Sequence, residues 1–192
     1  TPIIGSLGLF EDVGKHTTAG FKSAGDVIVL LGSDTTWDSI NGLAGSEYLE
    51  LIHDKVEGQP VLDLDLEVRV QAVCRDAVKN GLVSSAHDIS DGGIAVAIAE
   101  CAIIGEIGAT ITESPGNRWD AQLFGETQSR ILASVAPVNL NAVEILAAKQ
   151  NVPMTSIGVV GGEKLSLGDE ISLSLTDADE AWKNGFSKAT SG

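Results

Sequence analysis

One polar corner of the chain has the residue types and spacing best suited to chemistry. The stretch from Ser85 to Glu100 opens with a polar run, His87-Asp88-Ile89-Ser90-Asp91, continues through Gly92-Gly93 and ends in an apolar, helix-like segment. This order predicts a strand, a tight loop and a helix N-terminus. The first N–H groups of a helix lack intrahelical partners and carry partial positive charge, so such a corner can hold a phosphate.

Two interpretations of this corner remain open on residue types alone. In the first, the glycines let the backbone approach an anion, while Asp88 and Asp91 add Mg²⁺ ligands. In the second, Ser90 or Asp91 caps the helix, worth about 1 kcal/mol, and the glycines serve close helix–sheet packing. The stretch matches neither a P-loop nor a G-x-G-x-x-G sequence. His87 is either a general base that titrates near neutrality or a structural hydrogen-bond partner.

A second polar stretch, Gly125-Glu126-Thr127-Gln128-Ser129-Arg130, leads directly into an apolar run that predicts a strand. Because open α/β sheets bind ligands in crevices at strand ends, we expect Glu126, Gln128 and Ser129 to face the same crevice as Asp88. The alternative is an exposed loop in which Arg130 and Glu126 form a surface ion pair worth under about 1 kcal/mol.

Composition sets the class of protein that must position these residues. The chain has 192 residues, 43% hydrophobic and only 4% aromatic, which is typical of α/β packing rather than of an aromatic-rich β-sandwich. The formal net charge of −15, without a basic cluster, argues against a nucleic-acid partner. Cys74 and Cys101 form no C-x-x-C pair, which favours free thiols in a reducing compartment. The most apolar run is short and contains Glu100, so we expect a buried helix, no membrane span and a soluble, cytoplasmic protein.

Hydrophobic periodicity and turn residues predict a mixed order of helices and strands. A mixed order of this kind predicts an α/β or α+β fold, with a mixed sheet flanked by helices. Helices are expected over about 46–57, 65–80, 93–104 and 139–150, with helical potential in the tail from residue 176. Strands are expected over about 2–13, 27–31, 109–112, 130–135 and 152–160, a hairpin over 164–175 and a turn over 114–117.

Six segments in a fixed order resemble the C-terminal part of the phosphoribosylformylglycinamidine synthase family, in its small-subunit form. This family is the synthetase of purine biosynthesis, and the resemblance extends over residues 1–188. Its sister enzymes are aminoimidazole ribonucleotide synthase and selenophosphate synthetase. The segments are Thr1-Pro2-x-Ile4-Gly5, Gly8-Leu9-x-Glu11-Asp12, Gly25–Gly32, Gly45–Leu49, His87–Gly93 and Leu123–Arg130.

The resemblance implies a fold and a reaction. Residues 32–192 would form an α/β domain like the C-terminal domain of AIR synthase, and residues 1–31 the last strand or strands of a preceding β-rich, AIR synthase N-terminal-like domain. The implied enzyme is an ATP-dependent C–N ligase that converts formylglycinamide ribonucleotide and glutamine-derived ammonia to the amidine, with ADP and phosphate as the other products. The implied cofactors are Mg²⁺ and ATP/ADP. The implied partners are the remaining synthase domains, a glutaminase subunit and a small bridging subunit.

The resemblance also implies roles for individual residues. Asp88 matches a metal-linked aspartate, and a nucleotide-phosphate contact is implied for Ser90, Asp91, Gly92 and Gly93. A substrate-like crevice is implied for Glu126, Thr127 and Gln128. The family has two pseudo-equivalent sites, and this half corresponds to the auxiliary one, so we expect no catalytic residue here and no synthase activity from the chain alone.

Two alternatives stay open beside this hypothesis. The chain is then either a non-catalytic structural or assembly module, or a domain of one of the sister enzymes. In each case the apolar opening segment lacks the β-rich domain it would pack against, which predicts self-association or disorder there.

Overall fold

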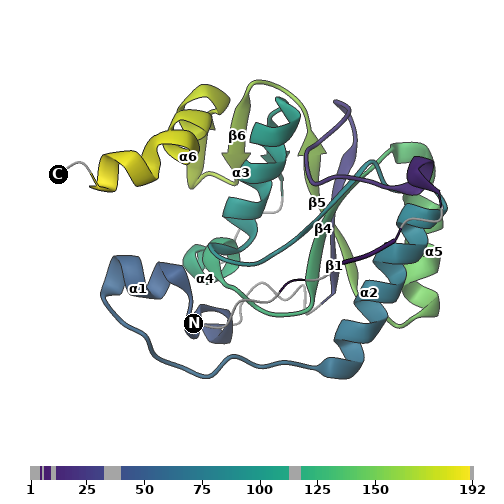
Figure 1. Ribbon diagram of the computed structural model, residues 1–192, viewed down its shortest axis with the longest axis horizontal. Coiled ribbons are helices and arrows are strands. Elements are labelled where there is room, and N and C mark those ends of the chain that lie inside the picture. Colours follow the sequence, from purple (N-terminus) through teal and green to yellow (C-terminus); the bar gives the residue numbers. More distant parts are fainter. Residues whose placement is uncertain (1–4, 6, 10–11, 33–39, 113–117, 191–192) are drawn as a thin grey trace.

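A seven-stranded mixed sheet forms the centre of the molecule, as expected from the sequence (Figure 1). The computed structural model describes residues 5, 7–9, 12–32, 40–112 and 118–190. The strand order is β2-β4-β1-β5-β3-β6-β7, and the β3–β6 pair is parallel whereas the other paired strands are antiparallel. The strands are β1 (Val27–Gly32), β2 (Ser85–Asp88), β3 (Ala109–Ile111), β4 (Arg130–Val135), β5 (Met154–Val160), β6 (Lys164–Leu167) and β7 (Ile171–Ser174).

Helices cover both faces of this sheet. Figure 1 shows α2 and α5 together on one side, and α3, α4 and α6 on the other. No helix within the described ranges is long and apolar enough to cross a membrane. The helices are α1 (Glu47–His53), α2 (Leu64–Lys79), α3 (Gly93–Gly105), α4 (Trp119–Phe124), α5 (Leu140–Lys149) and α6 (Leu175–Thr190), with 3₁₀ turns η1 (Val13–Lys15), η2 (Ile40–Leu43) and η3 (Pro137–Asn139).

Strand β1 is an interior strand of this sheet, hydrogen-bonded to β4 on one side and β5 on the other. Its side chains alternate between two cores: Ile28 and Leu30 pack in the cluster around α3, whereas Leu31 packs against α2 and α5. A strand buried on both faces and paired on both edges is part of this α/β domain. We therefore propose that the α/β domain begins a few residues before β1, rather than at residue 32 as the resemblance implies.

The opening segment also differs from expectation. Residues 5 and 7–9 form no strand, and residues 13–15 form the 3₁₀ turn η1, where the Asp12 side chain accepts a hydrogen bond from the Gly14 N–H. The predicted strand over 2–13 is therefore wrong for its described residues. The predicted turn over 114–117 lies outside the described residues.

Helix α2 shows how local sequence determines a packed element. Asp63 caps its first turn by accepting a hydrogen bond from the Leu66 N–H at 2.9 Å. Val70, Val73 and Ala77 recur at three- and four-residue spacing and are buried, as predicted. The helix thereby lies across β1 and β4 and supplies one wall of the pocket described next.

Candidate functional site

The predicted corner forms where β2 ends and α3 begins. Gly92 and Gly93 both have positive φ, 78° and 67°. A Cβ on Gly93 would lie 2.7 Å from the carbonyl oxygen of Gly125 and 2.8 Å from that of Leu123. The glycines therefore serve backbone conformation and close packing against the end of α4. The hypothesis that Ser90 or Asp91 caps α3 is wrong, because Gly92 is the N-cap residue and no side chain caps this helix.

Glu126 joins this corner to helix α1. Its Oε1 atom accepts hydrogen bonds from the N–H groups of Gly92 at 2.8 Å and Glu47 at 2.9 Å. Its own N–H donates to the Gly42 carbonyl at 2.7 Å. One carboxylate oxygen thus lies at the N-termini of both α1 and α3, where negative charge is stabilised by the helix dipoles.

Arg130 fixes the loop that carries Glu126. Its guanidinium donates to two backbone carbonyls, those of Thr127 at 3.1 Å and Gly125 at 2.5 Å, so the alternative of an Arg130–Glu126 surface pair is wrong. Only 8% of Arg130 is exposed, and this burial lowers the pKa of the guanidinium to about 10. Ser129 adopts the left-handed conformation with φ 62°, and its buried Oγ has no hydrogen-bond partner among the described residues.

The corner and the loop line one pocket of about 500 Å³. Helix α2 closes its opposite wall with Glu67, Val70 and Gln71. The structure thereby brings together the residues expected to share a crevice, although Gly92 and Gly93 are not among its lining residues. The predicted residues in its wall are Asp88, Ser90, Asp91, Glu126, Gln128 and Ser129, joined by Arg130.

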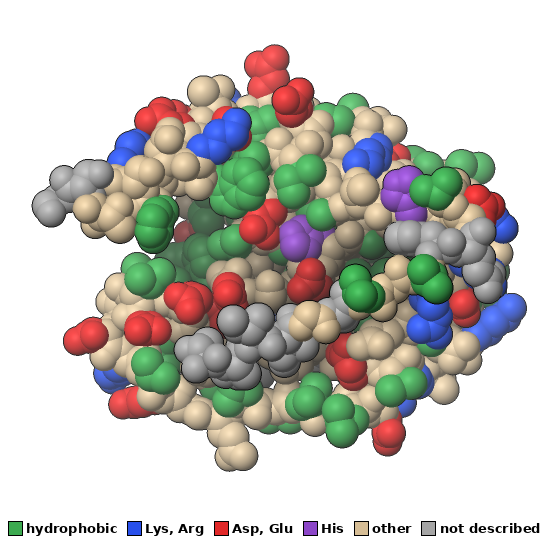
Figure 2. Space-filling model, in the orientation of Figure 1, with side chains coloured by type: hydrophobic (Ala, Val, Ile, Leu, Met, Phe, Trp, Pro, Cys, Tyr) green, Lys and Arg blue, Asp and Glu red, His purple; other side chains and the backbone are tan. Residues whose placement is uncertain are grey.

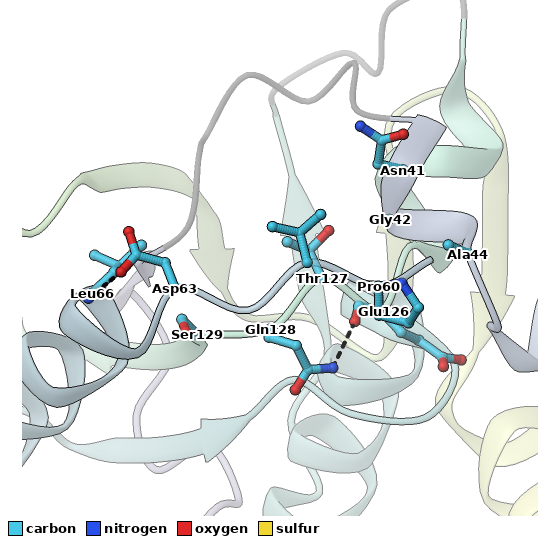
Figure 3. A pocket seen from close by; sticks show the side chains of 11 residues that line it. Asn41, Gly42, Ala44, Pro60, Asp63, Leu66, Glu126, Thr127, Gln128 and Ser129 are labelled. Carbon is cyan, nitrogen blue, oxygen red and sulfur yellow. Dashed lines mark hydrogen bonds between the residues drawn. The ribbon is translucent and has the colours of Figure 1, made fainter. Parts of the chain in front are cut away.

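Thr127 lies on the other side of the loop. It lines a second, smaller pocket of about 240 Å³ with Asn41 and Leu66, shown in Figure 3. In this view the carboxylate of Glu126 points away from Thr127, and the Gln128 amide turns back to the Glu126 carbonyl, at 3.2 Å. The three residues predicted to form a substrate-like crevice, Glu126, Thr127 and Gln128, therefore all line this smaller pocket, although their side chains point in different directions.

His87 has a carboxylate partner at each ring nitrogen. Its Nδ1 lies 3.2 Å from Asp88 Oδ1, and its Nε2 lies 3.0 Å from Oε2 of Glu100 on α3. The imidazole is mostly buried between β2 and α3. This geometry favours the structural interpretation of His87 over a general base.

The charge around the pocket is mostly negative. Figure 2 shows acidic side chains spread across this view of the molecule, with lysines and arginines mainly toward its edges. Within the described residues, no group of three or more His, Cys, Asp or Glu side chains could hold a metal ion. Asp88, with 76% of its side chain exposed, offers a single carboxylate. Proteins often bind Mg²⁺ through one or two carboxylates, while water and phosphate oxygens complete the coordination shell. The single carboxylate of Asp88 fits a site of this kind.

The fold and its helix-flanked mixed sheet define an α/β domain. Residues 23–169 match the family model described as AIR synthase related protein, C-terminal domain, and the chain belongs to this family.

The chain is similar to curated proteins named phosphoribosylformylglycinamidine synthase subunit PurL. It is 40% identical to the one from Alkaliphilus metalliredigens over 191 residues, covering 97% of this chain and 25% of the relative. It is 44% identical to that of Synechocystis sp. over 197 residues, covering 98% of this chain and 25% of the relative. The chain thus spans about a quarter of the length of these relatives.

Solved structures share the fold. T. maritima PurL complexed with FGAR has a TM-score of 0.71 at 21% identity, covering 87% of this chain and 30% of that chain. T. maritima PurL complexed with ATP has a TM-score of 0.68 at 18% identity, covering 87% and 28%. A thiamine-monophosphate kinase from Stenotrophomonas maltophilia has a TM-score of 0.56 at 19% identity, covering 80% and 53%.

Sequence reasoning missed the α2 side of the pocket. Glu67 and Gln71 lie one turn apart, next to the buried Val70, and Gln71 Nε2 donates to Glu67 Oε1 at 2.6 Å. The signal was present in the helical spacing, because a polar residue next to the buried stripe lies at the edge of the packed face.

Proposed function

We propose that the chain is the C-terminal part of a PurL subunit of phosphoribosylformylglycinamidine synthase, an ATP-dependent C–N ligase of purine biosynthesis. The observation that carries this proposal is 40–44% identity to PurL proteins over almost the whole chain. A sister enzyme such as aminoimidazole ribonucleotide synthase or selenophosphate synthetase is not favoured, because the relatives at 40–44% identity are PurL proteins. The activity belongs to the whole subunit, and we expect none from this chain alone.

Within that subunit, the 500 Å³ pocket would take part in a nucleotide site. Ser90 and Asp91 would contact the nucleotide, and the Gly92-Gly93 turn would shape the corner beside it. Asp88 would supply one Mg²⁺ ligand, and the metal would neutralise phosphate charge against the acidic rim. The T. maritima PurL structures with ATP and ADP support nucleotide binding as the role of this fold.

The second polar loop would act mainly by positioning. Because Glu126 already accepts two backbone hydrogen bonds, its part is to hold the α3 corner in place. Thr127 and Gln128 would face the adjoining crevice, whose similarity to a substrate site rests on the resemblance. The role as an auxiliary rather than a catalytic site is part of the same proposal, since no catalytic residue is assigned to this chain.

The proposal extends to partners and location. The remainder of the PurL polypeptide would supply the β-rich domains, and a glutaminase and a bridging subunit would deliver ammonia. The PurLQS structure from T. maritima supports a multisubunit assembly. We propose a cytoplasmic location on the strength of the same similarity.

The test is isothermal titration of the chain with ADP and Mg²⁺. We expect Asp88→Ala to weaken binding about tenfold, since a metal ligand is lost. Asp169→Ala, an exposed aspartate in the β6–β7 turn, removes the same charge away from the pocket and is expected to bind as the wild type does. No binding by the wild-type chain at millimolar ADP and Mg²⁺ would favour the structural-module alternative.

A further inference from the structure

Two backbone N–H groups at the α3 corner already have acceptors within the protein. The Gly92 N–H donates to Glu126 Oε1, and the Gly93 N–H donates to the Ser90 carbonyl at 3.0 Å. A phosphate at this helix start would compete with both bonds, one of them to a carboxylate. The corner is therefore a poor primary seat for an anion in this arrangement.

The loop before β4 contributes an unpaired donor to the pocket. Ser129 is 9% exposed, and its Oγ is buried without a hydrogen-bond partner among the described residues. A buried hydroxyl without a partner costs about 1–3 kcal/mol, and a bound water, ion or ligand that completes it removes that cost. Ser129 lines the same pocket as Ser90 and Asp91.

The neighbouring residue brings a buried positive charge. Arg130 also lines the pocket, and no carboxylate lies within ion-pair distance of it among the described residues. Its partners are two neutral carbonyl groups. A buried charge is screened far less by water than the exposed carboxylate of Asp88. Among the described residues that line the pocket, Arg130 is the one cationic side chain, so an anion is favoured beside it, although Glu67, Asp88, Asp91 and Glu126 make the rest of the wall acidic.

We propose that Ser129 and Arg130 form the oxyanion seat of this pocket and take the phosphate group of its ligand. The Ser129 hydroxyl would donate to a phosphate oxygen, and the Arg130 guanidinium would compensate its charge. This inference rests on the proposed nucleotide site, and it moves the phosphate from the start of α3 to the start of β4. The phosphate of a nucleotide and free inorganic phosphate share this chemistry, and two probes distinguish them.

The test measures the affinity of the full chain for two probes by isothermal titration: ADP with Mg²⁺, and inorganic phosphate without metal. Ser129→Ala is expected to weaken the binding of ADP about tenfold, the loss of one hydrogen bond to a charged group. Its thermal midpoint is expected to stay or rise, because an unpaired buried hydroxyl is removed. Ser172→Ala, an exposed serine of β7 far from the pocket, is the matched control. Arg130→Lys keeps the positive charge but cannot reproduce the two hydrogen bonds that the guanidinium donates to backbone carbonyls. It is expected to weaken ADP binding further.

The outcomes separate this inference from the proposed function. Asp88→Ala should weaken the binding of ADP with Mg²⁺ but leave the binding of metal-free phosphate unaffected, whereas Ser129→Ala should weaken the binding of both probes. If the wild-type chain binds phosphate and Ser129→Ala weakens that binding, the seat also takes free phosphate. If Ser129→Ala leaves the ADP affinity within twofold while Asp88→Ala weakens it, the seat is overturned and the nucleotide site stands. If the wild-type chain binds neither probe, both are overturned.

Discussion

At the scale of single residues, one oxygen atom organises the candidate site. Glu126 Oε1 accepts N–H groups from residues 34 and 79 positions away in sequence, at the starts of α3 and α1. Spacing along the chain predicted that Glu126 lies near the Asp88 corner, but not which groups it bonds. The capping hypothesis for Ser90 and Asp91 was wrong for a similar reason. The position of a cap depends on the backbone angles, and the sequence Gly92-Gly93 does not determine these angles, because glycine adopts many conformations.

The bridging role of Glu126 is testable by removing its charge alone. Glu126→Gln keeps the shape and one acceptor oxygen, but charge-assisted hydrogen bonds are roughly twice as strong as neutral ones. We expect the free energy of unfolding to fall by about 1–2 kcal/mol, measured by urea denaturation. Gln128→Ala, in the same loop and with an exposed amide, should change it by less than about 0.5 kcal/mol. Equal midpoints for Glu126→Gln and wild type would contradict the bridge.

The ion pair between Arg118 and Asp120 makes the free energy of unfolding depend on pH. Arg118 donates from Nε and Nη2 to both oxygens of Asp120, each at 2.8 Å, and this hydrogen bonding lowers the pKa of Asp120 against the opposing effect of its burial. A lowered folded-state pKa stabilises the protein above the unfolded-state value near 3.8, and this contribution disappears as the pH falls through the folded value. Urea unfolding from about pH 6 to pH 3 should therefore show a steeper acid loss for wild type than for Asp120→Asn. Parallel curves would show that the pair adds nothing.

At the scale of elements, periodic segments were predictable and short ones were not. Helices α2, α3 and α5 follow the expected spans closely, because several apolar residues repeat at helical spacing. The six-residue helix α4 was missed: it is too short to show a period, and its N-cap residue Arg118 makes no side-chain cap. The five apolar residues of β1 predicted a strand, but so short a run does not show to which sheet the strand belongs.

The packing of α3 against α4 depends on the absence of a side chain at Gly93. A Cβ there would meet three backbone atoms of residues 123–125 within 2.8 Å, in addition to the strain of positive φ. We expect Gly93→Ala to lower the unfolding free energy by about 2–4 kcal/mol. Gly81→Ala, at φ 64° but in open space, has only the conformational penalty of about 1 kcal/mol and is the matched control. If thermal and urea unfolding show equal losses in both variants, close packing at Gly93 is not limiting.

At the scale of the whole molecule, a strongly acidic chain carries fully exposed apolar side chains. The net charge is −15, and Leu7 and Leu9 of the opening segment are about as exposed as in an extended chain, at 105% and 101%. Helix α6 adds Trp182 and Phe186, because only Ala178 of this helix is buried. Apolar contact between copies is therefore favoured by these surfaces and opposed by charge repulsion.

The balance between these two forces predicts association that increases with salt. At about 0.02 M NaCl the Debye length is about 20 Å, so charge repulsion between copies should keep the chain monomeric. At about 0.3 M NaCl the Debye length falls to roughly 6 Å and the repulsion is largely screened. Sedimentation velocity should then show a rising weight-average mass. We expect Leu7→Ser with Leu9→Ser to abolish the rise, because these two side chains are fully exposed. We expect Trp182→Gln with Phe186→Gln to leave the rise in place, because these side chains are partly covered, at 54% and 82% exposed. The reverse result would assign the contact to α6, and a monomer at every salt concentration would show that the opening segment does not associate.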